Sequence, residues 1–542
     1  MSVPTAPLDP SADMSRDASP SPNGGAVAAP RPRPVGPSIG TGPVDRARDG
    51  ARHTARRVRA TGRFLVEAPG QVLGVVREAT PSSVVSWTRD IALPYEHSLA
   101  APPVGSGLRP VPGHAGDPVL GCIRDLTGDR VSWLMESNER FGPVFWQQLA
   151  GRRAVFVMGP DEAGQILVNA DKDFSNDGWQ ELIGKFFDRG LMLLSFQEHL
   201  DHRRIMQSAF TPKRLRGYLE GMDRRISTDL DASWPTEGPT TLYQRMKDLA
   251  MRVAADVFLG VELDRPSRDH LLAGFHAQPR AATEFLRMDL PGTLWGRGRN
   301  GYDDVTRWLR SQLDDKRAGD GDDLFSAMVH ARDDDGSAFT DEEIVRHMNF
   351  MWFAAHDTTT LAMAMMAWGF AAHPEWQERA YAESAALGDG PLRPEDLKSL
   401  TAIELVMNEV MRLWPPVPVM VRQAVRDTAL GDYYIPEGTW IAVMNPATHR
   451  LPEYWTDPDT FDPGRFEEGR EEHKQHKHLY YPFGAGAHKC IGFAFAQLET
   501  KAMWHRLLLT RRFEVAPGYQ PTMGWKALPE PTDDLPVTIH PR

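Results

Sequence analysis

The feature that most constrains this chain is a short cysteine loop near its C-terminus, Phe483-Gly-Ala-Gly-Ala-His-Lys-Cys490-Ile-Gly492. Glycines on both sides of the cysteine suit a backbone that must pass close to a flat object. A helical pattern starts at Phe493, and a cysteine at a helix N-terminus is favoured as the thiolate, because the helix dipole stabilises negative charge. A lone cysteine is more often a small buried hydrophobe. From these residues alone both interpretations, a buried hydrophobe and a functional thiolate, stay open.

The composition is that of an ordinary globular protein. The 542 residues are 41% hydrophobic and 25% charged, and the formal net charge is −12. A chain of this kind can bury a cofactor, and its acidic balance argues against nucleic-acid binding. Two cysteines, Cys122 and Cys490, exclude a secreted disulfide scaffold. The N-terminus lacks an apolar signal core and the apolar run 350–372 contains His356 and Asp357, so we expect a cytoplasmic protein without a membrane span.

Three segments are expected along the chain. Residues 1–43 hold ten prolines and no aromatic residue, a composition typical of disorder. Residues 44–100 begin with seven arginines and two acids over 44–63 and continue with apolar residues. We expect a solvated linker there, and peripheral contact with anionic lipid is the alternative. Residues 101–542 are expected to form one large domain.

The patterns in this domain are mainly helical. Apolar residues recur every three or four positions over 242–259, and Thr340-Asp-Glu-Glu343 is a capping box that predicts a long helix to about Ala372. Strand-like runs cover 143–149 and 153–158. The expected fold class is therefore mainly α with a small β portion (α+β).

The cysteine loop matches Phe-x-x-Gly-x-x-x-Cys-x-Gly, and with it the chain resembles the cytochrome P-450 family of haem-thiolate monooxygenases. The resemblance implies haem b between the long helix and the cysteine-loop helix, with Cys490 as the axial ligand of the iron. It also implies that Phe483 packs beside the sulfur and that Gly484 and Gly492 shape the loop around the cofactor. His488 stands where many members have arginine, and it is expected to contact a haem propionate.

Three threonines lie within the long helix, in Ala354-Ala-His-Asp357-Thr358-Thr-Thr. A mid-helix threonine hydroxyl can bond the carbonyl four residues back, here Ala354. Taken alone, this segment predicts one of two things. It is either part of a buried core helix, or it bends so that small residues line a groove beside the Asp357 acid and the Thr358 alcohol. It resembles the family's Ala/Gly-Gly-x-Asp/Glu-Thr motif, which implies that Asp357 and Thr358 are catalytic in oxygen activation. Ala355 replaces the usual glycine, so we expect a slightly tighter groove, and His356 is expected to be a satisfied core or surface histidine.

Charged residues elsewhere occur in the order of the family's motifs. Glu409 and Arg412 alone would be an ordinary i,i+3 surface pair. With Arg465 downstream, the resemblance implies a buried structural network that holds the cysteine loop. It also implies that His199, Arg203 and Arg422 bind the haem propionates. A basic face is expected to dock a ferredoxin or flavodoxin, itself served by a reductase, and comprises Arg204, Lys213, Arg214, Arg216 and Lys489.

Positions that match the family's substrate-facing segments are bulky and apolar, which favours a lipophilic substrate such as a terpene, sterol, polyketide or fatty acyl compound. The expected activity is hydroxylation or related oxidation by a monomer, with electrons from NAD(P)H through redox partners. A peroxide-driven peroxygenase and a catalytically silent haem- or ligand-binding protein are the alternatives. The expected pocket residues are Phe186, Met351, Ala354, Val419, Met420 and Trp525.

Overall fold

The computed structural model describes residues 96–117, 121–149, 152–260, 265–282, 287–525 and 528–542. The side chains of Arg265, Arg268 and Trp525 are not described. The predictions for residues 1–43, and for 44–95 of the linker, lie outside these residues.

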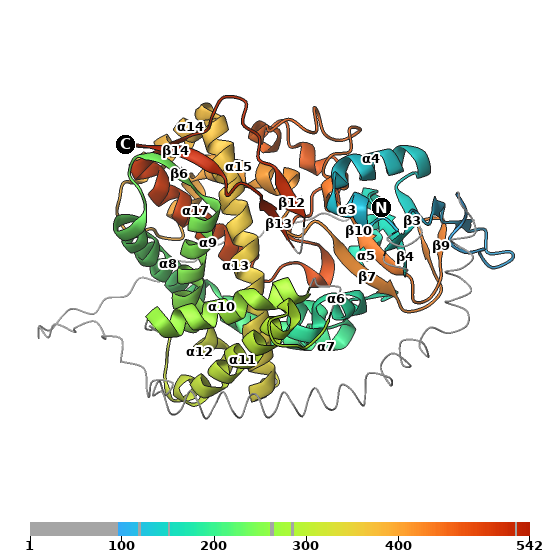
Figure 1. Ribbon diagram of the computed structural model, residues 1–542, viewed down its shortest axis with the longest axis horizontal. Coiled ribbons are helices and arrows are strands. Elements are labelled where there is room, and N and C mark those ends of the chain that lie inside the picture. Colours follow the sequence, from blue (N-terminus) through green and yellow to red (C-terminus); the bar gives the residue numbers. More distant parts are fainter. Residues whose placement is uncertain (1–95, 118–120, 150–151, 261–264, 283–286, 526–527) are drawn as a thin grey trace, which may run out of the picture.

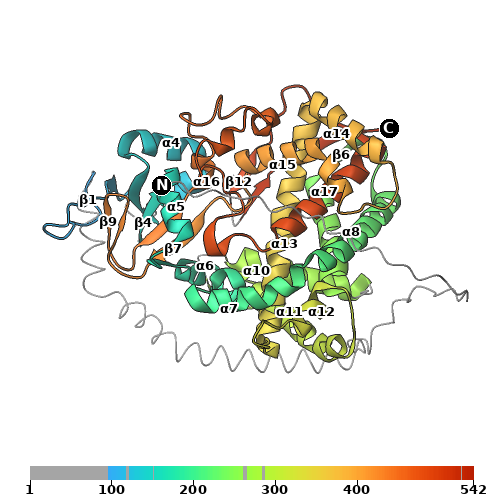
Figure 2. The same ribbon diagram turned by 180° about the vertical axis from the view of Figure 1, so that it is seen from behind.

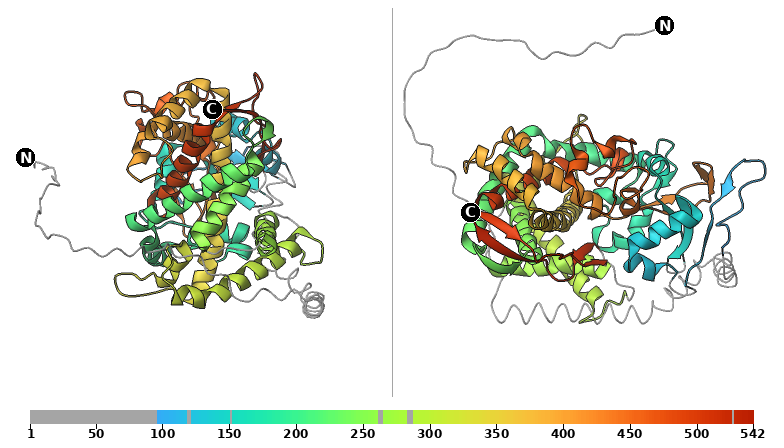
Figure 3. Two further views of the ribbon diagram at one scale, coloured as in Figure 1. Left: turned by 90° about the vertical axis from the view of Figure 1, so that its left-hand side faces the viewer. Right: turned by 90° about the horizontal axis from the view of Figure 1, so that it is seen from above.

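Helix α13 (Asp341–Ala372) runs through the middle of the protein (Figure 1) and is seen nearly end-on from above (Figure 3, right). The predicted capping box is confirmed: the Glu343 amide donates to Thr340 Oγ1 (3.3 Å), and the Thr340 amide donates to Glu343 Oε2 (2.9 Å). Most of the helix beyond its first turn is buried, as expected for a helix that is apolar on nearly all sides.

The other helices form the larger part of the protein around α13. Helices α9, α11, α15 and α17 pack directly on α13, and α8 packs against α17 and α9. Figure 2 shows α8 beside α17. The helices are α3 (Ile123–Thr127), α4 (Arg130–Phe141), α5 (Pro160–Val168), α6 (Asp177–Phe187), α7 (Phe196–Gln207), α8 (Pro212–Ser233), α9 (Tyr243–Ala254), α10 (Arg265–Ala282), α11 (Leu294–Ala318), α12 (Leu324–His330), α14 (Pro374–Leu387), α15 (Thr401–Leu413), α16 (Asn445–Thr448) and α17 (Phe493–Thr510).

A six-stranded mixed sheet lies on the opposite side from the C-terminus, in the order β2-β3-β4-β10-β7-β5. Its central strands are β4 and β10, which run parallel. Strand β10 is antiparallel to β7 on its other side, so Ile441 of β10 lies opposite both Val155 and Arg422. The strands of this sheet are β2 (Gly113–His114), β3 (Val144–Leu149), β4 (Arg152–Val157), β5 (Phe174–Ser175), β7 (Met420–Ala424) and β10 (Trp440–Val443).

Three smaller sheets complete the described β structure. One, in the order β1-β9-β8, extends from the edge of the molecule, and another, β11-β14-β6, lies by the C-terminus (Figure 1). The third is the hairpin β12-β13. Their strands are β1 (Arg109–Pro110), β6 (Gly238–Thr241), β8 (Thr428–Leu430), β9 (Tyr433–Ile435), β11 (Arg511–Glu514), β12 (Met523–Trp525), β13 (Pro529–Pro531) and β14 (Pro536–Pro541).

The predicted fold class, mainly α with a small β portion, is confirmed. The strands expected over 143–149 and 153–158 are β3 and β4, and the helix expected over 242–259 is α9 with a π-helical extension, Ala255–Leu259. Among the described helices, none is both long and apolar enough to cross a membrane.

Candidate active site

A cavity of about 1250 Å³ lies between α13 and the cysteine loop. Cys490 lines it on one side, and Ala354, Ala355 and Thr358 of α13 line it on another. Strands β7 and β10 and helix α6 contribute further walls, so the cavity lies where the helical part meets the six-stranded sheet. Most of its lining is apolar, which suits a lipophilic guest beside a large cofactor.

The cysteine loop is shaped by glycines in the left-handed backbone region. Gly484 has φ +71° and Gly486 has φ +64°. A Cβ on Gly486 would lie 2.2 Å from the Leu167 carbonyl oxygen, so no other residue fits there without displacing α5. The Cys490 amide donates to the Phe483 carbonyl (2.8 Å), which closes the loop and leaves the sulfur facing the cavity.

The Cys490 sulfur lines the cavity, and its surroundings favour the thiol over the thiolate. Burial raises the pKa of its thiol, and the Gly492 backbone N–H, Arg203 and Lys489 offset this only in part. The helix N-terminus is therefore not sufficient to hold a thiolate, whereas a bound metal ion would deprotonate the sulfur outright. Phe483 lines the same cavity and packs edge-to-face on Phe493 (centroids 4.9 Å apart).

A cluster of nitrogen donors, the cation cluster, lies at one edge of the cavity. It consists of His199 and Arg203 from α7, Arg422 from β7 and His488 from the cysteine loop. The His199 and His488 rings stack with centroids 3.6 Å apart, and Asn176 Nδ2 lies 2.9 Å from His488 Nδ1. The structure thus brings together all four residues that the resemblance assigned to the propionates, and it adds Asn176.

The cation cluster is short of negative charge. In the described part of the chain no carboxylate pairs with Arg203 or Arg422, and His199 Nδ1 is buried without a hydrogen-bond partner. Burial lowers the pKa of His199 to about 4 and that of Arg422 to about 10, and burial followed by the charge of Arg422 lowers the pKa of His488. The two imidazoles are therefore neutral near pH 7, and the charge to be balanced is that of Arg203 and Arg422. Two carboxylates such as haem propionates fit these guanidinium groups and the imidazole N–H donors.

Thr358 faces the cavity from α13, and its hydroxyl donates to the Ala354 carbonyl (2.7 Å), as predicted. Asp357 is oriented differently and is not among the lining residues. Its carboxylate meets Lys247 Nζ of α9 (3.0 Å) and His356 Nδ1 (3.1 Å). Burial favours the neutral acid, but the hydrogen bond and charge of His356 and the Lys247 ammonium outweigh it, so the pKa of Asp357 lies below its ordinary value.

His356 is a buried core histidine, as expected, and its Nε2 lies 3.1 Å from the Lys247 carbonyl. Sequence reasoning missed Lys247, because a lysine that is one of many charges on α9 gives no local signal of its partner. It also missed Glu499 of α17, a carboxyl that is 3% exposed and hydrogen-bonded to Thr359 of α13.

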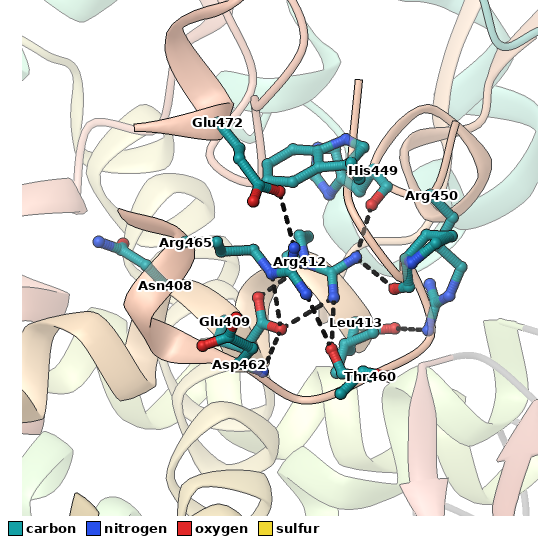
Figure 4. A network of polar contacts seen from close by, with 12 residues as sticks. Asn408, Glu409, Arg412, Leu413, His449, Arg450, Thr460, Asp462, Arg465 and Glu472 are labelled. Atoms are coloured by element: carbon teal, nitrogen blue, oxygen red, sulfur yellow. Dashed lines mark hydrogen bonds and ion pairs between the residues drawn. The ribbon is translucent and has the colours of Figure 1, made fainter. Parts of the chain in front are cut away.

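Glu409, Arg412 and Arg465 form the predicted network, and all three are at most 1% exposed (Figure 4). Arg412 donates to both Glu409 oxygens (2.7 and 2.8 Å), and Arg465 Nε donates to Glu409 Oε1 (3.1 Å). Arg465 also donates to Glu472 (2.7 Å). Each buried charge therefore has an opposite partner, as burial requires.

The network reaches the cysteine loop through His449. Arg412 Nη1 donates to the His449 carbonyl (2.9 Å), and the His449 ring nitrogen Nε2 accepts from the Tyr481 amide (3.2 Å). The Tyr481 carbonyl in turn accepts from the Gly484 amide (2.9 Å). These bonds connect α15 to the backbone that presents Cys490.

Four of the expected pocket residues, Met351, Ala354, Val419 and Met420, line the cavity. Phe186 does not line it among the described residues: its ring is fully buried and packs edge-to-face on Trp295 (5.0 Å). The Trp525 side chain lies outside the described part.

A family model described as Cytochrome P450 matches residues 111–528, which is more than half of the chain. The chain is a cytochrome P450. A relative in Mycobacterium tuberculosis named cytochrome P450 136 is 45% identical over 454 residues, which cover 82% of this chain and 92% of that protein. Abscisic acid 8'-hydroxylase 2 of rice, Oryza sativa, is 27% identical, over a region that covers 79% of this chain and 86% of that protein.

Solved P450 structures share the fold. The retinoic acid-bound cyanobacterial CYP120A1 superposes with a TM-score of 0.71 at 24% identity, over 79% of this chain and 99% of that one. The haem domain of cytochrome P450DA gives a TM-score of 0.70 at 22% identity, over 80% of this chain and 98% of that one. As a member of this family the chain is an oxidoreductase, a haem-thiolate monooxygenase. The cysteine facing a large cavity and the cation cluster without carboxylates both fit haem.

Proposed function

We propose that this P450 hydroxylates, or otherwise oxidises, a bulky lipophilic small molecule with electrons from NAD(P)H. The observation that carries the proposal is the cavity: its wall combines Cys490, three members of the cation cluster (Arg203, Arg422 and His488) and Thr358 with an apolar lining. Abscisic acid 8'-hydroxylase 2 is named for abscisic acid, and the CYP120A1 structure is described as bound to retinoic acid; both molecules are largely apolar. Terpene, sterol, polyketide and fatty acyl compounds are the substrate classes we propose.

In this proposal Cys490 would hold the haem iron, and the cation cluster would bind the propionates, with Phe483, Gly484 and Gly492 shaping the loop. The bound haem supplies an iron at which O₂ is activated, so that one oxygen atom enters the substrate and the other leaves as water. The Thr358 hydroxyl lines the cavity and donates its proton to the Ala354 carbonyl (2.7 Å), so its oxygen can accept a hydrogen bond from a group in the cavity. Asp357 is the neighbouring acid, and its carboxylate pairs with Lys247 of α9 (3.0 Å). To relay protons to Thr358, this carboxylate would have to leave Lys247, because consecutive helical residues do not face each other.

Electrons are proposed to arrive from a separate ferredoxin or flavodoxin and its reductase, at a basic face formed by Arg204, Lys213, Arg214, Arg216 and Lys489. We assign catalysis to residues 101–542 of a cytoplasmic monomer. Residues 1–43 are proposed to be an extension and residues 44–100 a basic linker, with weak peripheral membrane contact as its alternative role.

An optical titration tests the function. The purified protein is expected to show the red-shifted Soret band of thiolate ligation when reduced under carbon monoxide, and Cys490→Ser is expected to abolish it. Terpenes, sterols, fatty acids and macrolides are then added while the haem spin state is followed. A low-to-high-spin shift with one class, followed by turnover with surrogate redox partners, is the expected result. A normal protein without the thiolate band would refute the proposal.

A peroxide-driven peroxygenase is the second candidate. The acid–alcohol pair Asp357 and Thr358 favours the O₂-dependent reaction, because a peroxygenase receives its oxygen already reduced and does not need that proton route. A catalytically silent haem- or ligand-binding role is disfavoured for the same reason. Product formation with hydrogen peroxide but not with reduced ferredoxin would favour the peroxygenase instead.

A further inference from the structure

Asn176 stands at the N-terminus of α6, lines the cavity and is 2% exposed. An asparagine at this position usually accepts a hydrogen bond from the helix backbone through its side-chain oxygen. Here the side chain makes no such cap, and its Oδ1 is buried without a hydrogen-bond partner in the described part of the chain. The amide nitrogen Nδ2 makes the contacts instead, so the Asn176 side chain acts as a donor.

Two acceptors surround this nitrogen. Asn176 Nδ2 donates to the Met192 carbonyl, and because a carbonyl only accepts, this contact fixes which end of the amide carries the N–H groups. The same nitrogen lies 2.9 Å from His488 Nδ1 and 3.4 Å from His488 Nε2. Nδ1 is the closer atom, so it accepts the second N–H. A neutral imidazole has one donor and one acceptor, and the proton of His488 therefore lies on Nε2.

The ring of His488 is held on two sides. Its face stacks on His199, with centroids 3.6 Å apart, and its Nδ1 meets Asn176. Asn176 uses its two side-chain N–H groups on Met192 and His488, so its side chain has no donor left for an anion in the cavity. Any contribution of this side chain to binding a carboxylate must therefore pass through His488, which also lines the cavity.

We propose that Asn176 is a positioning residue that makes His488 a hydrogen-bond donor for a haem propionate. Where many family members have arginine, this chain has His488. A guanidinium is a donor at every nitrogen and needs no such partner, whereas a histidine in the wrong tautomer turns a lone pair toward the carboxylate. An asparagine that donates to Nδ1 disfavours that tautomer. This inference rests on the proposed role of the cation cluster in binding the propionates.

Haem release tests this assignment without turnover. The haem-loaded protein is mixed with excess apomyoglobin, and haem transfer is followed by absorbance. Asn176→Ala is expected to release haem about tenfold faster than the parent, as the loss of one hydrogen bond to a charged group implies. In a His488→Arg background the same substitution should change the rate by less than about twofold, because arginine donates without a partner. Gln180→Ala is the matched control: it removes another amide bond from α6 to this segment, at the Leu193 carbonyl, and should leave the rate unchanged.

The tautomer is read directly by nitrogen-15 NMR of the reduced, carbon monoxide-bound protein, which is diamagnetic, after labelling of its histidines. The signals of His488 are those that are missing from His488→Gln. In the parent the proton is expected on Nε2, and in Asn176→Ala a larger share should lie on Nδ1. The measurement on the parent needs no change at Asn176, so it decides even if Asn176→Ala folds poorly.

A proton on His488 Nδ1 in the parent would overturn the proposal, and so would unchanged haem release in Asn176→Ala. Equal acceleration by Asn176→Ala in the parent and in the His488→Arg background would overturn it too, since it would indicate a purely structural role through Met192. A missing thiolate band in the unaltered protein would defeat the proposed function, whereas a normal band with any of these three results defeats only this inference.

Discussion

Glu499 shows how one buried side chain couples the active-site helices to pH. Burial raises the pKa of this carboxyl to about 8, and the hydrogen bond from Thr359 lowers it only in part. In the unfolded chain the carboxyl titrates near its ordinary value of 4.5. Between these two pH values the folded protein keeps a proton that the unfolded chain releases. The free energy of unfolding contributed by this group therefore falls as pH rises from 4.5 to 8.

Glu499→Gln is expected to remove this dependence. Above pH 8 the variant should be more stable than the parent by up to roughly 5 kcal/mol, about 1.4 kcal/mol for each pH unit between 4.5 and 8. Near pH 4.5 the two should unfold alike. Denaturant unfolding followed by circular dichroism at pH 5, 7 and 8.5 measures the difference. Glu237→Gln, at an exposed site, is the control, and equal stabilities of Glu499→Gln and parent at pH 8.5 would contradict the prediction.

At the scale of elements, the Glu409 network determines how α15 supports the cysteine loop. Glu409→Ala leaves Arg412 and Arg465 buried without their shared carboxylate, which typically costs about 3–5 kcal/mol. We expect the variant to lose most of its haem, because the bonds from Arg412 through His449 to Tyr481 lose their support. Haem content per chain and the carbon monoxide spectrum measure this.

Glu342→Ala breaks ion pairs with Arg310 and Arg346 at the start of α13 and serves as the control, with haem content unchanged. Retention of normal haem in Glu409→Ala would show that the network is dispensable for the loop.

The sequence predicts those contacts of the fold and the site whose partners lie close together along the chain. The Glu409–Arg412 spacing, the capping box of α13 and the bond from Thr358 to Ala354 are all set within one helix, and the structure confirms these contacts. Asp357 pairs with Lys247, which lies 110 residues away in sequence, and Arg412 donates to His449, which lies 37 residues away. Tertiary packing alone brings these partners together, so the sequence gives no local signal of either contact. Phe186 is bulky and apolar, as a pocket residue would be, but tertiary packing places its ring against Trp295 instead.

At the scale of the whole molecule, charge distribution decides where an acidic electron donor can dock. The chain carries a net charge of −12, so at long range it repels such a partner, and only a local basic face can attract it. Within the proposed face Arg204, Arg214 and Arg216 each lie within 3.2–3.6 Å of an acid, namely Asp201, Asp322 and Glu395. These pairs reduce the attraction, and they leave Lys213 and Lys489 as exposed cations.

Lys213→Glu combined with Arg216→Glu is therefore expected to slow reduction by ferredoxin about tenfold at low salt, because the reversed charges repel the donor. The difference should shrink as ionic strength rises to about 0.5 M, where screening removes attraction and repulsion alike. Stopped-flow reduction under carbon monoxide measures both rates, and Arg307→Glu, on the exposed side of α11, is the control that reverses a single charge outside the proposed face. Because neither substitution touches the cavity, substrate-induced spin shifts should stay unchanged. A rate that is independent of salt in the parent, or equal slowing by Arg307→Glu, would show that the donor docks on another face.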